Sequence, residues 1–237
     1  MFDSILDPRV ILALATLGIG SYMDLRYREV SDLLWIIAAV LGLALHIIYP
    51  LPLLEHAYSI ALGSVTVLLI ALVAYRVGLF GGADAFALIT MLVLLPMHEK
   101  SMFPTLSILL NACIIAVTSS ILYNIIRNTM AVAKGINIFE GFNEPLAKKI
   151  LAFIIAQRID KAGRHYAFIA ESNTSNGKRF DLSLKHAEYS SYVNVNGNGV
   201  WAIVGLPFIF YILVGLVTML TVGDIFTAII TSMIKTY

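Results

Sequence analysis

The sequence predicts a polytopic α-helical membrane protein with six transmembrane helices and a small cytosolic α+β insert between helices five and six. Of its 237 residues, 59% are hydrophobic and 13% are charged, whereas soluble domains are about half apolar and a quarter charged. The apolar residues form six runs, and a long polar segment separates the fifth run from the sixth. So much apolar surface exceeds what a soluble core of this size could bury, so we expect a lipid bilayer to cover it.

The first apolar run begins at Pro8 and continues through Asp24 to about Tyr27. Pro8 suits the first turn of a helix, and Asp7 can cap that turn. A bilayer core of about 30 Å needs about 20 apolar residues in a helix, and the uncharged stretch 10–23 is short for that length. We therefore expect Asp24 to lie near the membrane interface.

Five further runs complete the predicted spans. They cover about residues 33–49, 57–75, 82–97, 104–126 and 200–222. Ser31 or Asp32 can cap the second span. A polar break at Gly223-Asp224 follows the last span and precedes a short amphipathic tail.

Three domains follow from this division of the chain. We expect a membrane domain at 1–130, a cytosolic insert at 131–199, and a last transmembrane helix with its tail at 200–237. Within the insert, Asn143-Glu144-Pro145 opens a predicted amphipathic helix that runs to about Asp160. Alternating apolar and polar residues predict strands, joined in part by a turn that contains Asn176-Gly177. The predicted strands are 165–170, 179–184 and 189–195, with the turn at 172–178.

The basic residues predict the orientation in the membrane. Most of them lie in the turns after the first and third spans and in the segment after the fifth, whereas the other side holds Arg9, Lys100 and Lys235. Cytoplasmic loops carry an excess of Lys and Arg. We therefore expect a multi-pass protein of the plasma membrane with both termini outside and the insert in the cytoplasm. Asp24 and Asp84 fall at that same cytoplasmic face.

Several classes of function are excluded by the composition. The net charge is +1 and no basic tract is dense enough for a nucleic-acid backbone, so we expect no nucleic-acid partner. The histidines are scattered without ligand spacing, and Cys113 is the one cysteine, so we expect no metal and no cofactor. Asp3 and Asp7 replace the basic start of a signal peptide, so none is expected.

Two aspartates interrupt the apolar pattern and are the candidate functional residues. Asp24 closes the first run, and Asp84 follows Phe80-Gly81-Gly82-Ala83 at the start of the fourth. An ionised aspartate at the centre of a transmembrane helix costs about 2.5–3.5 kcal/mol on insertion scales, and less near the interface. Each acid could merely cap a helix or pair with a nearby arginine. The small residues before Asp84 favour a further role, because they let an extended peptide backbone come close.

A pair of carboxylates can hydrolyse an amide without a metal or a covalent nucleophile. Two carboxylates close together share one proton, because like charges a few ångströms apart resist joint ionisation. The ionised member takes a proton from water while the neutral member donates to the carbonyl. The alternative is an ion-coupled membrane transporter that uses Asp24 and Asp84 as cation or proton sites. A carrier predicts inverted repeats, and the sequence shows no repeat.

The two aspartate segments resemble those of a known protease family. Gly81-Gly82-Ala83-Asp84-Ala85 resembles the GxGD motif of intramembrane aspartyl proteases, although Ala83 stands where the motif has glycine. The segment SYMDLRYREV at 21–30 is similar to the first-aspartate segment of prepilin-type peptidases. Together with six spans and an insert before the last, they resemble archaeal preflagellin peptidases.

This resemblance implies an aspartic-type membrane endopeptidase that removes the leader of preflagellin or type IV pilin-like precursors. It assigns catalysis to Asp24 and Asp84, and the active-site motif to Gly81, Gly82 and Ala83. The implied partner is a precursor with a basic leader, cut after a glycine that precedes a hydrophobic helix. Leu206-Pro207-Phe208 faintly resembles a proline motif near the last helix of presenilin-like enzymes, and we expect instead a proline kink in the last span.

Overall fold

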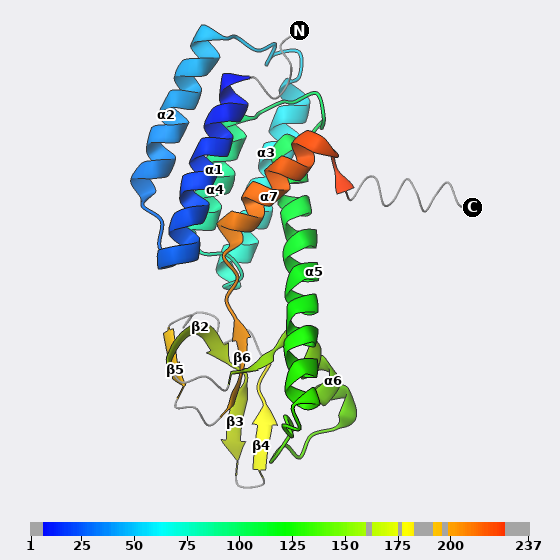
Figure 1. Ribbon diagram of the computed structural model, residues 1–237. Coiled ribbons are helices and arrows are strands. Elements are labelled where there is room, and N and C mark those ends of the chain that lie inside the picture. The colour runs from blue at the N-terminus through cyan, green and yellow to red at the C-terminus, as the bar shows by residue number, and fades with distance from the viewer. Residues whose placement is uncertain (1–6, 160–162, 175–176, 183–191, 196–198, 226–237) are drawn as a thin grey trace, which may run out of the picture. The chain divides into compact units, whose positions relative to one another are not determined.

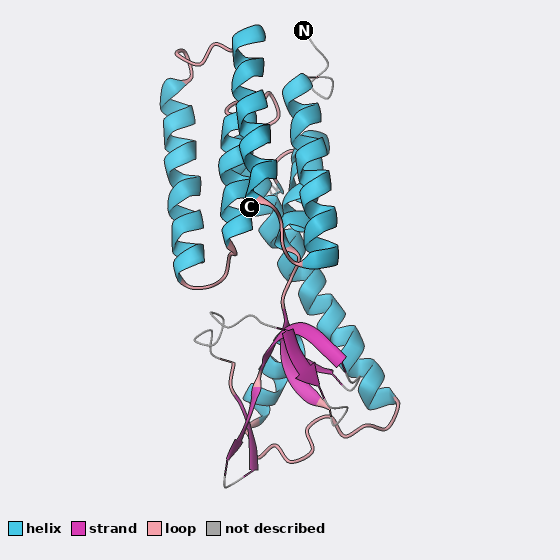
Figure 2. Cartoon of the chain, turned by 90° about the vertical axis from the view of Figure 1, so that its left-hand side faces the viewer, coloured by secondary structure: helices cyan, strands magenta, loops and turns pink. Residues whose placement is uncertain are grey.

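The computed structural model describes residues 7–159, 163–174, 177–182, 192–195 and 199–225 and is mostly helical. The chain forms two compact units, and helix α5 contributes residues to both. The first unit contains residues 1–116 and 207–237, and the second contains residues 117–206. Figure 2 shows the helices in cyan and the strands, all of which belong to the second unit, in magenta.

The first unit is a bundle of apolar helices (Figure 1). Its members are α1 (Pro8–Tyr27), α2 (Asp32–Ile48), α3 (Ala57–Arg76), α4 (Gly82–Leu94), the first part of α5 (Pro104–Ala133) and α7 (Phe208–Thr221). Helix α1 packs against α2, α4 and α7, and α4 also packs against α2 and α3. The helices α1 to α4 run in alternate directions (Figure 1), so Asp24 and Asp84 lie at the same end of the bundle.

The start of α1 confirms a predicted cap. The carboxylate of Asp7 accepts a hydrogen bond of 2.8 Å from the backbone amide of Arg9, as an N-cap residue does. The Arg9 side chain is almost buried, and its Nη2 lies 2.7 Å from Asp7 Oδ2. Burial raises the pKa of Asp7, but the hydrogen bonds and charge of Arg9 outweigh it, so this pKa lies below its ordinary value.

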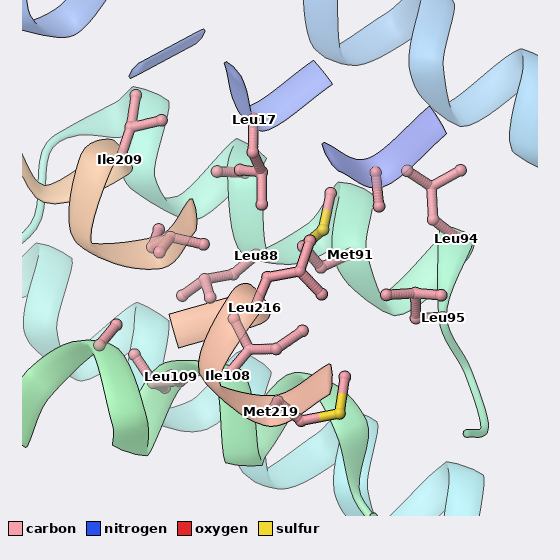
Figure 3. Packing of buried hydrophobic residues seen from close by; sticks show 14 of the residues in the cluster. Leu17, Leu88, Met91, Leu94, Leu95, Ile108, Leu109, Ile209, Leu216 and Met219 are labelled. Carbon is pink, nitrogen blue, oxygen red and sulfur yellow. The ribbon is translucent and has the colours of Figure 1, made fainter. Parts of the chain in front are cut away.

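The core of the first unit lies between α1, α4, α5 and α7. Figure 3 shows Leu17, Met91, Ile108, Ile209 and Leu216 packed together, and each of these side chains is at most 1% exposed. At Gly215 of α7 the packing is closer still. An added Cβ would collide with the carbonyl oxygen of Ile108 and lie 3.0 Å from the amide nitrogen of Ala112 on α5. The backbones of α5 and α7 are therefore in direct contact.

The outer helices expose their apolar side chains. Ile47 on α2 is 83% exposed and Val73 on α3 is 61% exposed. By length and composition, α3 and α5 could each cross a bilayer, and α2, α4 and α7 are shorter apolar helices. Such broad apolar surface is unusual on soluble monomers, so the fold is consistent with a membrane protein. The number of six spans stays a prediction.

The second unit combines the rest of α5 with α6 (Leu146–Ile155) and two small antiparallel sheets. The strands are β1 (Gln157–Ile159), β2 (Gly163–Ile169), β3 (Glu171–Thr174), β4 (Gly177–Phe180), β5 (Tyr192–Val195) and β6 (Val200–Val204). One sheet has the order β1-β6-β2-β5, and β3 pairs with β4. In the larger hydrophobic core of this unit, Phe139 stacks on Trp201 and Phe142 stacks on Phe180.

An ion pair between Glu144 and Lys148 lies at the start of α6. The hydrogen bond and charge of Lys148 hold the pKa of Glu144 below its ordinary value.

Two predicted elements of this region are wrong. The helix expected to reach Asp160 ends at Ile155, and β1 follows it. The run that was expected to start the last span at Val200 is the strand β6, and α7 begins only at Phe208. A short apolar run with valine and isoleucine fits a buried strand as well as a helix, and here pairing with β1 and β2 decides the conformation.

The strands of this region also differ from the expectation. A turn at 172–178 was expected between the strands 165–170 and 179–184, but β2 pairs with β5 and β6, and the hairpin is β3-β4. The expected turn at 172–178 therefore contains parts of two strands. The strand expected at 189–195 is β5, starting at Tyr192. Residues 183–191 and the expected amphipathic tail from residue 226 lie outside the described residues.

A buried asparagine joins α5 to α6. Asn128 is 1% exposed, and its Nδ2 donates hydrogen bonds of 2.8 Å to the carbonyl oxygens of Phe153 and Ala156. These carbonyls belong to the end of α6, where no intrahelical amide remains for them. The side chain thus caps α6 from a neighbouring helix.

Replacing Asn128 with alanine is expected to destabilise the second unit by about 1–3 kcal/mol, because two buried carbonyl groups lose their donor. Arg127→Ala is the matched control, since Arg127 is the preceding residue of α5 and is exposed. Thermal unfolding of both variants in detergent checks this expectation. Equal melting temperatures for the two variants would show that the capping bonds do not stabilise the fold.

Candidate active site

Asp24 lies in the last turn of α1. The helix ends at Tyr27, and the C-cap residue Arg28 adopts a left-handed conformation with φ of 59° and donates its amide to the Asp24 carbonyl. The side chain of Asp24 is half-buried, and its Oδ2 accepts a hydrogen bond of 3.3 Å from the backbone amide of Ile209. One turn earlier, the buried Ser21 donates its Oγ proton to the carbonyl oxygen of Ile209 at 3.3 Å. The last turns of α1 therefore hold the start of α7.

Asp84 lies in the first turn of α4. Gly81 is the N-cap residue, and its amide donates a hydrogen bond of 2.8 Å to Asp84 Oδ2. A carboxylate three residues into a helix commonly reaches back to the N-cap amide, and the helix dipole favours its negative charge there. Asp84 therefore caps its own helix, which is one of the two structural roles that the sequence analysis allowed for each aspartate. This contact also fixes the direction of the carboxylate.

The two motif glycines are exposed and have few neighbouring atoms. A Cβ added at Gly82 would meet no atom within 4 Å, and one at Gly81 would meet only Asp84 Oδ2, at 3.5 Å. The packing of the first unit therefore does not require a glycine at residue 82. Ala83, in contrast, packs against the hydrophobic core.

The structure places Asp24 and Asp84 at the same end of the bundle. They come from α1 and α4, which pack against each other (Figure 1). The motif loop also reaches α7, because the ring of Phe80 stacks on that of Phe208 with centroids 4.7 Å apart and an angle of 28°. Figure 1 shows the end of α1 and the starts of α4 and α7 at one end of the bundle.

The neighbouring arginines differ in their relation to the site. The charge of Arg28 acts on Asp24. Arg26 donates a hydrogen bond of 3.3 Å to the hydroxyl of Tyr22 and lies 5.6 Å from the ring centroid of Tyr27. Arg28 is therefore a positive charge close to Asp24, whereas the Arg26 side chain contacts two tyrosines.

This arrangement suits hydrolysis by acid–base catalysis. Two carboxylates close enough to repel each other electrostatically favour a state with one proton between them. In that state one carboxyl group is a base and the other is an acid. Among the residues that the structure describes, no group of three or more His, Cys, Asp or Glu side chains could hold a metal ion.

The sequence did not reveal the part that α7 plays in the site. Pro207 was expected to kink the last helix, but it is the N-cap residue immediately before α7. Phe208 and Ile209, which follow it, make the contacts to Phe80 and Asp24. A proline just before an apolar run is a known signal for the start of a helix, and this signal could have located the first turn.

Comparison with protein-family models gives a match. Residues 11–121 match the model of the type IV leader peptidase family. The matched stretch contains the described Asp24 and Asp84 sites and helices α2 to α4 in full, together with most of α1 and part of α5. No curated protein matches the chain. The match confirms the resemblance to prepilin and preflagellin peptidases that the two aspartate segments predict.

Proposed function

We propose that this chain, whose residues 11–121 carry the sequence pattern of the type IV leader peptidase family, is an aspartic-type membrane endopeptidase. The family indicates a peptidase that acts on type IV precursors in a membrane setting. The proposal adds that the substrates are preflagellin or pilin-like precursors with a basic leader. The observation that carries the two-aspartate mechanism is the convergence of Asp24 and Asp84, from separate helices, at one end of the bundle.

The proposed reaction uses one water molecule and the two carboxylates. The ionised aspartate removes a proton from water as the water oxygen attacks the peptide carbonyl carbon, and the protonated aspartate donates to the carbonyl oxygen. When the tetrahedral intermediate collapses, one of its hydroxyl groups returns a proton to the ionised aspartate, the carbon–nitrogen bond breaks, and the leaving amine takes the proton of the other aspartate. The site thus returns to its starting state with one shared proton.

The location of the site in the membrane is part of the proposal. Six spans with both termini outside place the two aspartates and the insert at the cytoplasmic face, where water reaches them. Exposed apolar side chains on α2 and α3 support a bilayer around the first unit. The exposed position of Gly82 supports entry of an extended peptide backbone, because no atom of the described residues lies within 4 Å of a Cβ placed there.

Cleavage of a defined precursor tests this function. We expect the purified chain, reconstituted in lipid vesicles, to cut a pilin-like precursor after the glycine that precedes its hydrophobic helix, and N-terminal sequencing of the product identifies the cut. Chelators and reagents for serine or thiol nucleophiles are expected to leave the rate unchanged. Absence of cleavage, or loss of cleavage with a chelator, would contradict the proposal.

The ion-coupled transporter is not favoured. The family match indicates a peptidase, and the apposition of a capped Asp84 with Asp24 at one end of the bundle does not resemble a carrier site near the midplane of the bilayer. An ion-flux assay with the same vesicles would detect a carrier directly.

A further inference from the structure

We infer that the first turn of α7 positions both aspartates, through the backbone amide of Ile209 for Asp24 and through the ring of Phe208 for the loop that carries Asp84. This inference rests on the proposed function, because it concerns the geometry of the same site. Two consecutive residues, neither of which lies within the matched stretch 11–121, would then belong to the active site.

The amide of Ile209 is available to Asp24 because of its place in the helix. Pro207 is the N-cap and Phe208 the first helical residue, so Ile209 belongs to the first turn. Amides in a first turn have no acceptor within their own helix. This amide donates to Asp24 Oδ2 at 3.3 Å. The positive end of the α7 dipole adds to the stabilisation of a carboxylate at this position.

Ile209 is also held firmly on its other side. Its side chain is 1% exposed and is among the core side chains drawn in Figure 3, and its carbonyl oxygen accepts a hydrogen bond from Ser21 Oγ. Ser21 and Asp24 are one turn apart on α1, so one stretch of α1 binds both polar groups of the same residue. The donor therefore has a fixed position relative to Asp24.

The ring of Phe208 extends the same turn to the second aspartate. It stacks on Phe80 with centroids 4.7 Å apart. Phe80 immediately precedes Gly81, whose amide holds the Asp84 carboxylate at 2.8 Å. A displacement of the first turn of α7 would thus disturb both carboxylates together, whereas a displacement further along α7 would not. Phe208 and Ile209 act through the aspartates and are positioning residues.

Ile209→Pro, compared with Ile209→Ala, isolates the contribution of the amide. Proline is tolerated in a first helical turn, where it removes an amide that makes no intrahelical bond. Alanine keeps the amide and removes more of the side chain than proline does. We expect kcat for precursor cleavage to be at least about tenfold lower in the proline variant than in the alanine variant, with KM within about twofold, because the lost bond is to a charged group.

The pH–rate profile separates positioning from a general loss of structure. The amide favours the ionised form of Asp24, so its removal is expected to move the acidic limb of the profile to higher pH. A merely structural defect would lower the rate at every pH and leave the limb in place. Equal kcat values for the two variants, or an acidic limb of the pH–rate profile at the same pH in both, would show that the amide does not position Asp24.

Phe208→Leu and its aromatic counterpart Phe208→Tyr test the ring independently of the amide. Leucine is expected to lower kcat about tenfold, and tyrosine to restore most of it, because stacking on Phe80 requires an aromatic ring. Phe210→Leu is the matched control, since Phe210 lies on the same helix and its ring contacts Tyr211. If Phe208→Leu and Phe210→Leu cleave at the same rate, the ring has no positioning role.

The wild-type chain distinguishes failure of this inference from failure of the proposed function. If the wild type cleaves the precursor and the α7 variants match their controls, only the inference is wrong. If the wild type does not cleave, the proposed function itself is wrong. A spin-label distance between residues beside Asp24 and Asp84, measured without substrate, is expected to lengthen in Ile209→Pro and gives a readout that does not depend on activity.

Discussion

Asp24→Asn and Asp84→Asn, made separately, are each expected to lower the rate of precursor cleavage by about 10²–10⁴-fold, the usual contribution of a general acid or base. Asparagine has nearly the shape of aspartate but can neither accept nor supply the shared proton. Oδ1 of either asparagine can still accept the amide hydrogen bond now made by Ile209 or Gly81, so the fold should persist. The measurement is the initial cleavage rate at equal concentrations of folded protein.

Asp32→Asn is the matched control for this experiment. Asp32 begins α2, is exposed, and is the aspartate closest in sequence to Asp24 on its C-terminal side. Its replacement changes the net charge by the same amount and is expected to leave the rate within about twofold. Full activity in either Asp24→Asn or Asp84→Asn would remove the two-carboxylate mechanism, whatever the control showed.

Gly215→Ala is expected to cause the largest loss of stability, about 1–3 kcal/mol or more, as overpacked substitutions in a close-packed core do. The added methyl group would collide with the carbonyl oxygen of Ile108 and crowd the amide of Ala112. Both are backbone atoms of α5, so neither can rotate away and α7 must move as a whole. Thermal unfolding in detergent or lipid measures the loss.

Gly18→Ala provides the comparison for a helical glycine with room beside it. A Cβ at Gly18 would meet no atom within 4 Å, and alanine favours a helix over glycine by up to about 1 kcal/mol. This variant is therefore expected to be as stable as the wild type or slightly more stable. Equal melting temperatures for Gly215→Ala and Gly18→Ala would show that α5 and α7 are not in close contact.

The helices of the first unit follow closely from local signals in the sequence. Helix α1 has the predicted bounds Pro8–Tyr27, and the expected cap at Asp7 is present. Helix α3 differs from its prediction by one residue at its end. Long apolar runs bounded by polar or proline residues predict helices reliably, because both the core and the caps are encoded within the run.

The elements and contacts that the sequence did not predict depend on residues far apart in the chain. Helix α5 was expected to end near residue 126 but continues to Ala133, and Asn128 within this extension caps α6. Strand β6 is a strand because β1 and β2 pair with it. The hydrogen bond between Ile209 and Asp24 joins residues 185 positions apart. Hydrophobic periodicity carries no information about such pairings, so the sequence offers the two aspartates as candidates but does not predict the amide that donates to one of them.

The open space beside Gly82 affects which amino-acid substitutions this protein can accept. The backbone of α5 occupies the place that a side chain at Gly215 would need, whereas none of the described residues occupies the place beside Gly82. A screen that selects only for a folded protein would therefore reject most replacements of Gly215 and accept many at Gly82. Fewer substitutions of Gly82 would be accepted only in a screen that also selects for substrate cleavage. Comparing the two screens would therefore show which residues lie along the path of the substrate.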